Sequence, residues 1–157
     1  MLELRNYQQD SLEALTRYLR LVTERGNADT AFYEITRRKY YPVPGLEALP
    51  YVCLRVPTGG GKTYMACHAL GIVAREWLQM ERALCLWLVP SNTIRLQTAE
   101  ALKNPRHPYR QALDEAFDGR VRVFDIADFT HIRPHDIRDH CCIVVGTIQT
   151  LRVSNTE

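Results

Sequence analysis

The chain has 157 residues, of which 46% are hydrophobic and 24% are charged, and its formal net charge is +2. This length allows one core of ordinary size, and the composition excludes disordered and fibrous proteins. The net charge is too small to indicate a nucleic-acid partner, although the cations divide into seventeen Arg and only three Lys. The N-terminus lacks the pattern of a secretory signal, and the longest apolar run, Ala83 to Val89, is too short to cross a bilayer. We therefore expect a cytoplasmic protein with no membrane segment.

The first predicted element is an amphipathic helix from Tyr7 to Val22, because apolar residues recur there with a period close to 3.6. Gly26 and Asn27 end this pattern. The next stretch, Ala28 to Pro50, mixes polar and aromatic residues with three prolines, which favours a long ordered loop.

Short apolar runs alternate with helical patterns through the rest of the chain. Buried strands are predicted at residues 51–56, 83–89, 121–126 and 141–145, and helices at about 62–80, 93–102 and 109–117. This alternation is typical of an α/β fold with a parallel sheet flanked by helices. We predict that residues 1–50 hold the first helix and a connector, and that residues 51–157 form the main domain.

A glycine-rich segment, Pro57-Thr-Gly-Gly-Gly-Lys-Thr63, stands between a predicted strand and a predicted helix, as in a phosphate-binding P-loop. Glycines let the backbone curl so that N–H groups point at phosphate oxygens. Lys62 is expected to contact the outer phosphates and Thr63 to bind Mg²⁺, so these two are the candidate catalytic residues. The strict motif has Gly six residues before the lysine, whereas Val56 occupies that position here.

Three flanking segments add candidate contacts. In Leu4-Arg-Asn-Tyr-Gln8, the Gln8 amide can donate and accept at once, as adenine recognition requires. The segment from Val89 to Gln97 offers a hydroxyl and backbone N–H groups at a helix start, which can bind phosphate without reading sequence. Thr147 ends the last strand and is a further candidate. The alternatives are an exposed glutamine, an ordinary helix cap and a plain strand end.

Together these segments, which span Leu4 to Leu151, resemble superfamily 2 helicases of the DEAD/DEAH-box type, in the N-terminal part of their first RecA-like domain. Within that superfamily, the stretches from Thr30 to Glu34 and from Pro42 to Thr63 look like the helicase part of type III restriction enzyme Res subunits. The resemblance implies an ATP-dependent helicase or translocase that uses ATP and Mg²⁺. It implies double-stranded DNA contacted through its backbone, and a modification methyltransferase subunit as a partner.

The resemblance also assigns the site residues. For nucleotide it implies Gln8, Pro57, Thr58, Gly59, Gly60, Gly61, Lys62 and Thr63, the last with Mg²⁺, and for nucleic acid it implies Pro90, Ser91, Gln97 and Thr147. The family places an Asp-Glu pair and arginine fingers further along its chains. We therefore expect an incomplete RecA-like domain that binds nucleotide weakly and hydrolyses none alone. Asp125 ends an apolar run, but it precedes Thr147 and Ile126 follows it, which is the wrong order for the missing Mg²⁺ partner.

Other functions remain open from the sequence. Another P-loop ATPase or a small-molecule kinase would use Lys62 and Thr63 in the same way, and a truncated remnant would bind without catalysis. A metal-binding module is the third alternative, since three histidines and two cysteines lie between His131 and Cys142. Adjacent strand residues point to opposite faces, so solvated loop histidines are favoured there. The five cysteines lack C-x-x-C spacing and predict reduced, buried thiols: Cys53, Cys67, Cys85, Cys141 and Cys142.

Overall fold

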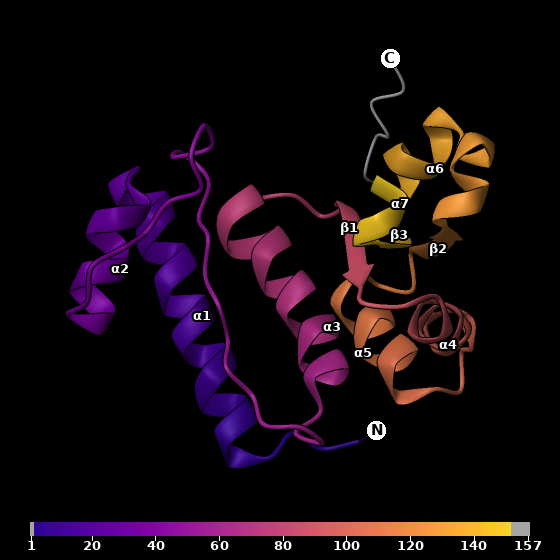
Figure 1. Ribbon diagram of the computed structural model, residues 1–157, viewed down its shortest axis with the longest axis horizontal. Helices are drawn as coiled ribbons and strands as arrows, with labels where there is room; N and C mark the ends of the chain where they lie inside the picture. Colours follow the sequence, from indigo (N-terminus) through magenta and orange to yellow (C-terminus); the bar gives the residue numbers. More distant parts are fainter. Residues whose placement is uncertain (1, 152–157) are drawn as a thin grey trace. The chain divides into compact units, whose positions relative to one another are not determined.

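The computed structural model describes residues 2–151, which form two compact units. Residues 2–79 make up the first, here called the helical unit, and residues 80–151 make up the second, the sheet unit. The elements of each unit follow one another along the colour gradient of Figure 1. The predicted division of the chain at residue 50 stays a prediction.

The helical unit is built around its first helix. Its elements are α1 (Asn6–Arg25), α2 (Ala28–Thr36), α3 (Lys62–Ile72) and the π-helical segment η1 (Val73–Leu78). Helix α1 buries an apolar face that forms one cluster with Met65 and Ile72 of α3. Gly26 ends α1 in the left-handed conformation, with φ 65°, and its N–H donates to the carbonyl of Val22 at 2.8 Å. The helix predicted from periodicity is confirmed, with three further residues at its C-terminal end.

The long loop predicted for residues 28–50 is wrong in its first part, because α2 occupies Ala28–Thr36. The side chain of Asn27 accepts a hydrogen bond from the N–H of Thr30 at 2.9 Å and so caps the helix start. Ala28 and Ala31 are buried against the cluster around α1. Phe32 and Ile35 pack partly buried on the same cluster, so the apolar residues of α2 have helical spacing, but over only nine residues.

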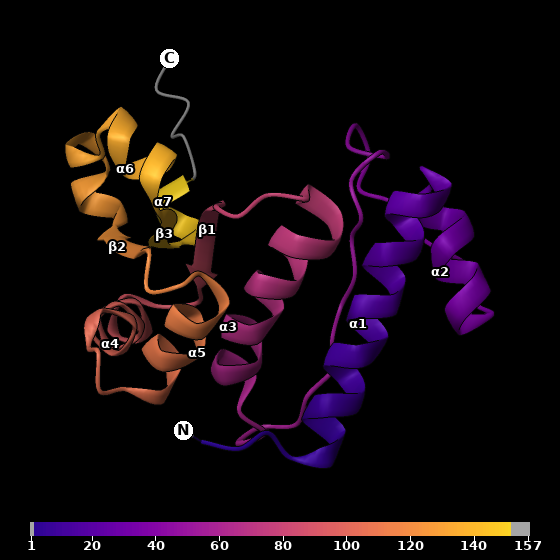
Figure 2. The same ribbon diagram turned by 180° about the vertical axis from the view of Figure 1, so that it is seen from behind.

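The strand predicted for residues 51–56 is also wrong. This segment is extended but pairs with no strand in the described part of the chain. It runs along α1 in Figure 2, and Val52 and Val56 pack on the apolar cluster, whereas Tyr51 and Leu54 are exposed. The N–H of Tyr51 donates to the hydroxyl of Tyr40 at 2.7 Å instead of to a neighbouring strand. Two residues of this run are therefore partly covered by helices, and the run belongs to no sheet among the described residues.

The sheet unit contains a three-stranded parallel sheet in the order β1-β3-β2. Its elements are β1 (Leu84–Val89), α4 (Asn92–Lys103), α5 (Pro108–Ala116), β2 (Val121–Asp125), the 3-10 segment η2 (Ile126–His131), α6 (Pro134–Asp139), β3 (Cys141–Thr147) and α7 (Ile148–Leu151). The central strand, β3, is buried along its whole length. The parallel α/β architecture predicted from the alternation is confirmed.

A buried carboxylate fixes the start of α6. Asp136 is 2% exposed, accepts from the N–H of Arg133 at 2.9 Å and lies 2.6 Å from the guanidinium of Arg122 on β2. The Arg133 hydrogen bond, followed by the Arg122 charge, holds the pKa of the Asp136 carboxyl below its usual range. A buried charge needs such partners, and Arg122 connects α6 to the sheet while Arg133 caps the start of the helix.

The cysteines divide by position. Cys67, Cys141 and Cys142 are buried as predicted, and burial raises the pKa of the Cys141 thiol to about 12. Cys53 is exposed because its extended segment turns that side chain away from the core, so the prediction of a buried thiol is wrong there. No helix within residues 2–151 is both long and apolar enough to cross a membrane.

Core packing gives a first prediction for the sheet unit. Leu102 on α4 is fully buried and Leu96 on the same helix is 58% exposed. We expect Leu102→Ala to lower the free energy of unfolding by about 2–5 kcal/mol, because it leaves a cavity. The matched variant Leu96→Ala is expected to change it by less than about 0.5 kcal/mol. Trp87 fluorescence during urea denaturation, in a Trp77→Phe background, measures this unit, and equal losses for both variants would contradict the packing.

Candidate functional site

The glycine-rich segment forms a tight loop that leads directly into α3. The N–H of Gly60 donates to the carbonyl of Pro57 at 3.0 Å, and Gly59 and Gly61 both take positive φ values, 76° and 74°. A Cβ on Gly60 would come within 2.5 Å of Val56 Cγ1 and 2.9 Å of the Pro57 oxygen. The curl of the loop therefore depends on glycine at three successive positions.

Lys62 and Thr63 are the first two residues of α3. The N–H groups of the first helical turn have no partners within the helix, and the helix dipole adds partial positive charge there. The Lys62 ammonium lies back over the loop, where it donates to the carbonyls of Val56 at 3.0 Å and Pro57 at 2.9 Å. An open hollow of about 420 Å³ lies beside the loop and is lined by Arg55, Val56, Pro57 and Lys62. A cation and the N–H groups at a helix start, beside a hollow, can bind an anion.

Helix α1 holds this loop through one carbonyl group. The Gly60 oxygen accepts from the hydroxyl of Tyr7 and from Nε2 of Gln8, each at 2.9 Å. Because the peptide group is planar and trans, its N–H points away from its C=O. Two donors that hold the Gly60 oxygen toward α1 therefore turn the N–H of Gly61 away from α1.

Gln8 is 5% exposed, and both ends of its amide have partners. Its Oε1 accepts from the N–H of Arg5 at 2.8 Å while Nε2 donates to Gly60. One amide hydrogen and one oxygen lone pair remain for a further partner. The structure thus places Gln8 beside the loop and gives it a task that the sequence did not reveal, while its contact with adenine stays a prediction.

In the sheet unit, Pro90, Ser91 and Thr147 lie at the carboxyl edge of the sheet. Val89 pairs with Thr147 in the parallel register, so the residues that follow β1 stand beside the end of β3. The Ser91 hydroxyl accepts from the N–H of Ile94 at 3.3 Å and caps α4, which is the alternative role considered from the sequence. Gln97 is exposed, further along α4.

Thr147 is almost fully buried, with 2% exposure. Its hydroxyl is 2.7 Å from the Thr150 hydroxyl and accepts from the Thr150 N–H at 3.3 Å. In this conformation the side chain therefore supports the first turn of α7. A contact of Thr147 with another molecule has to involve its backbone or a rotation of the hydroxyl.

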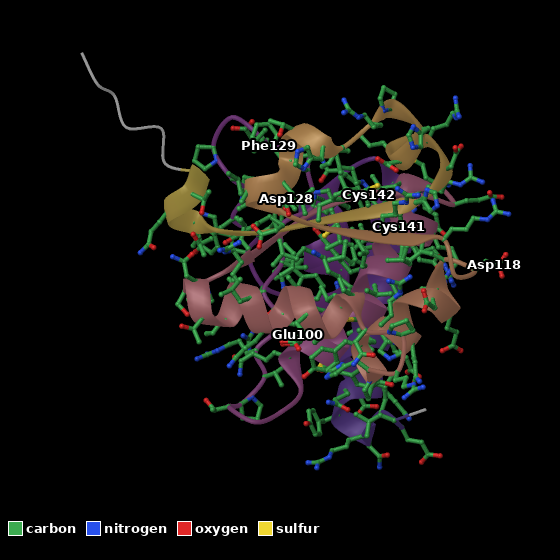
Figure 3. All side chains as sticks on the ribbon, turned by 90° about the vertical axis from the view of Figure 1, so that its right-hand side faces the viewer. Glu100, Asp118, Asp128, Phe129, Cys141 and Cys142 are labelled. Atoms are coloured by element: carbon green, nitrogen blue, oxygen red, sulfur yellow. The ribbon has the colours of Figure 1, made fainter. Side chains whose placement is uncertain are left out.

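Asp125 ends β2 at the same edge and is already engaged. Its carboxylate forms an ion pair with Arg95 of α4, and its other oxygen accepts from the N–H of Ala127 at 2.9 Å. This supports its exclusion as a Mg²⁺ partner. The ion pair stands at an open hollow of about 780 Å³, which Glu100 of α4 and Asp128 of η2 also line (Figure 3).

Two residues of these sites were not predicted. Tyr7 was assigned to the apolar face of a helix, although its hydroxyl is what reaches the loop. Arg95 lies between Ser91 and Gln97, which the sequence predicted to contact nucleic acid, but no role was predicted for Arg95 itself. Its position next to a strand-ending aspartate appears only when α4 packs across β2.

The histidines considered for a metal-binding module do not form a metal site in the described part of the chain. His131 and His135 have side chains that are 73% and 55% exposed. Residues 2–151 contain no group of three or more His, Cys, Asp or Glu side chains arranged to hold a metal ion.

The contact between Gln8 and the loop gives a second prediction. Gly45→Ala and Gly61→Ala both place a side chain at positive φ, which costs about 1 kcal/mol or more. Only the Gly61 Cβ meets a neighbour, since it would lie 2.6 Å from Gln8 Nε2, whereas Gly45 has open space. We expect Gly61→Ala to lower the free energy of unfolding by about 1 kcal/mol more than Gly45→Ala, because the displaced amide loses its hydrogen bond.

Trp77 fluorescence in a Trp87→Phe background reports on the helical unit and provides this measurement. In a Gln8→Ala background the extra loss should disappear, as a double-mutant cycle requires. An extra loss that persists without Gln8 would show that the two groups do not interact.

Comparison with known protein families matches the whole chain, residues 1–157, to the family described as type III restriction enzyme, res subunit. No curated protein and no solved structure matches the chain significantly. The family domain is helicase-like, with the RecA-like P-loop fold, so the family and fold predicted from the motifs are confirmed. The chain belongs to the family of type III restriction enzyme res subunits.

Proposed function

We propose that this chain is the ATP-binding part of a DNA-dependent helicase or translocase of the restriction type. The observation that carries the proposal is the glycine loop that ends in Lys62 at the start of α3, beside an open hollow. The family implies a helicase-like ATPase domain. DNA as the polymer, a double-stranded form of it, a methyltransferase partner and a cytoplasmic location are finer parts of the same proposal.

The residues present suit a nucleoside triphosphate with Mg²⁺. Lys62 would exchange its two carbonyl partners for phosphate oxygens, and the N–H groups of Gly59 and Gly61 would add neutral donors, whereas the Gly60 N–H already donates to the Pro57 carbonyl. Thr63 supplies the hydroxyl for Mg²⁺, which neutralises phosphate charge when it is bound. Pro57 and Thr58 form the outer turn of the loop.

Gln8 would recognise adenine through the amide hydrogen and the lone pair that the protein leaves unused. A single glutamine that contacts both the base and Gly60 couples base recognition to the conformation of the phosphate loop. Guanine presents the reverse donor and acceptor pattern, so the proposal includes a preference for ATP over GTP.

Nucleic acid would bind at the carboxyl edge of the sheet in the sheet unit. Pro90, Ser91 and Gln97 offer polar groups at the start of α4 and along it, and Thr147 offers its backbone. Contacts of this kind hold the phosphate backbone and carry no sequence information. The proposal therefore assigns no recognition sequence to these residues.

Removal of the loop lysine tests the proposal. Titration calorimetry with ATP and Mg²⁺ should show binding that Lys62→Ala weakens at least about tenfold, since a charge-assisted contact is lost. The control Lys103→Ala removes an exposed lysine of α4 and should bind as the unaltered chain does. Equal ATP affinity in both variants would refute a phosphate role for Lys62.

Tyr7 provides a separate test of how the loop is positioned. Tyr7→Phe removes one of the two donors to the Gly60 oxygen and keeps the ring. We expect the affinity for ATP to fall about threefold, within the range of one hydrogen bond, and the affinity for inorganic tripolyphosphate to fall equally. A loss confined to ATP would instead indicate that Tyr7 contacts the base.

A further inference from the structure

The C-terminal end of α2 presents three successive cations. Arg37 caps the C-terminal end of α2, adopts φ 56° and donates its N–H to the carbonyl of Tyr33 at 2.9 Å. The next two residues are Arg38 and Lys39, and all three side chains belong to exposed residues. Among the described residues, no carboxylate forms an ion pair with any of these three cations. Glu34 of the same helix pairs instead with Arg25, at 3.5 Å. The positive charge at this end of α2 is therefore uncompensated.

Two tyrosine rings stand open beside these cations. Tyr33 is 55% exposed and Tyr41 is 69% exposed. The Arg37 guanidinium lies 5.8 Å from the centre of the Tyr33 ring, and the Lys39 ammonium lies 5.3 Å from the centre of the Tyr41 ring. Each exposed ring thus carries a cation on its face.

Tyr40 shows what a structural tyrosine does in the same segment. It is 5% exposed, and its hydroxyl donates to the carbonyl of Leu49 and accepts from the N–H of Tyr51. Tyr33 and Tyr41 have no comparable burial. A cation at a helix C-terminus stabilises the helix dipole, but that effect accounts for one of the three charges and for neither ring.

We propose that this aromatic-basic patch, formed by Tyr33, Arg37, Arg38, Lys39 and Tyr41, binds single-stranded nucleic acid. The cations contact backbone phosphates and the rings stack on unpaired bases, a combination typical of surfaces that hold single strands without reading their sequence. Bases in a duplex are already stacked and leave the rings without partners. The inference rests on the proposed function only for the class of ligand, and it needs neither bound nucleotide nor the residues of the sheet unit.

Fluorescence anisotropy with a labelled oligothymidylate of about 16 nucleotides, near the upper end of single-strand site sizes, tests the stacking. Tyr33→Ala and Tyr41→Ala should each weaken binding about fivefold or more, and Tyr33→Phe and Tyr41→Phe should retain it. Tyr51→Ala is the matched control, because Tyr51 is 58% exposed and belongs to no such pair. Binding of Tyr33→Ala and Tyr41→Ala at unaltered affinity, or equal affinity for duplex and single strand, would overturn the proposal.

The salt dependence tests the cations. Arg37→Gln combined with Lys39→Gln should reduce the slope of log affinity against log salt by about 1.4, the value for two single-strand phosphate contacts. Arg17→Gln combined with Arg106→Gln removes the same charge at exposed positions elsewhere and should leave the slope unchanged. Equal slopes for the two double variants would overturn the assignment of phosphate contacts to Arg37 and Lys39.

The ATP titration separates this inference from the proposed function. A chain that binds ATP through Lys62, and whose oligonucleotide affinity is unaltered by Tyr33→Ala and Tyr41→Ala, overturns the patch and leaves the proposed ATP site standing. A chain that binds oligonucleotide through Tyr33 and Tyr41, with or without Lys62→Ala, supports the patch whatever the result with ATP.

Discussion

The carbonyl oxygen of Gly60 is the point on which the helical unit depends. It takes hydrogen bonds from two successive residues of α1, Tyr7 and Gln8, whose partner lies more than fifty positions later in the chain. The apolar cluster holds α1 against α3 along their length, but dispersion and burial are not directional. These two hydrogen bonds supply direction, since they fix which way one peptide group of the glycine loop faces. The geometry at the start of α3 therefore depends on how α1 is docked.

The sheet unit has a different organising constraint, the complete burial of β3. A strand buried on both faces needs a neighbour on each side and helical cover, which β1, β2 and α4 provide. The parallel register then brings the residues after β1 to the end of β3, and the Arg95–Asp125 ion pair connects α4 to the end of β2. Polar residues at this edge are thus assembled as a consequence of the register.

Periodicity and motif order predicted the elements whose own side chains decide their structure. Helix α1, the three strands of the sheet and the loop at Pro57–Thr63 are of this kind. The strand prediction for residues 51–56 failed because an apolar run does not specify its partner. Val52 and Val56 pack partly on the helical cluster, and the other four residues are exposed. Helix α2 was missed because its apolar face, Ala28, Ala31, Phe32 and Ile35, has helical spacing over only nine residues. Tyr7 and Arg95 could not be assigned from sequence, since each acts on a residue at least thirty positions away. The roles of the site residues remain predictions.

Lys62 donates to the carbonyls of Val56 and Pro57, so its exposed ammonium already has a preferred position before any ligand arrives. An anion that enters the hollow exchanges one set of partners for another and does not have to capture a freely rotating ammonium. The conformational entropy of this long side chain is thus lost on folding and not on association. A loop arranged in this way discriminates by charge, because neutral carbonyl acceptors already satisfy the lysine and only a stronger, anionic acceptor gains by replacing them.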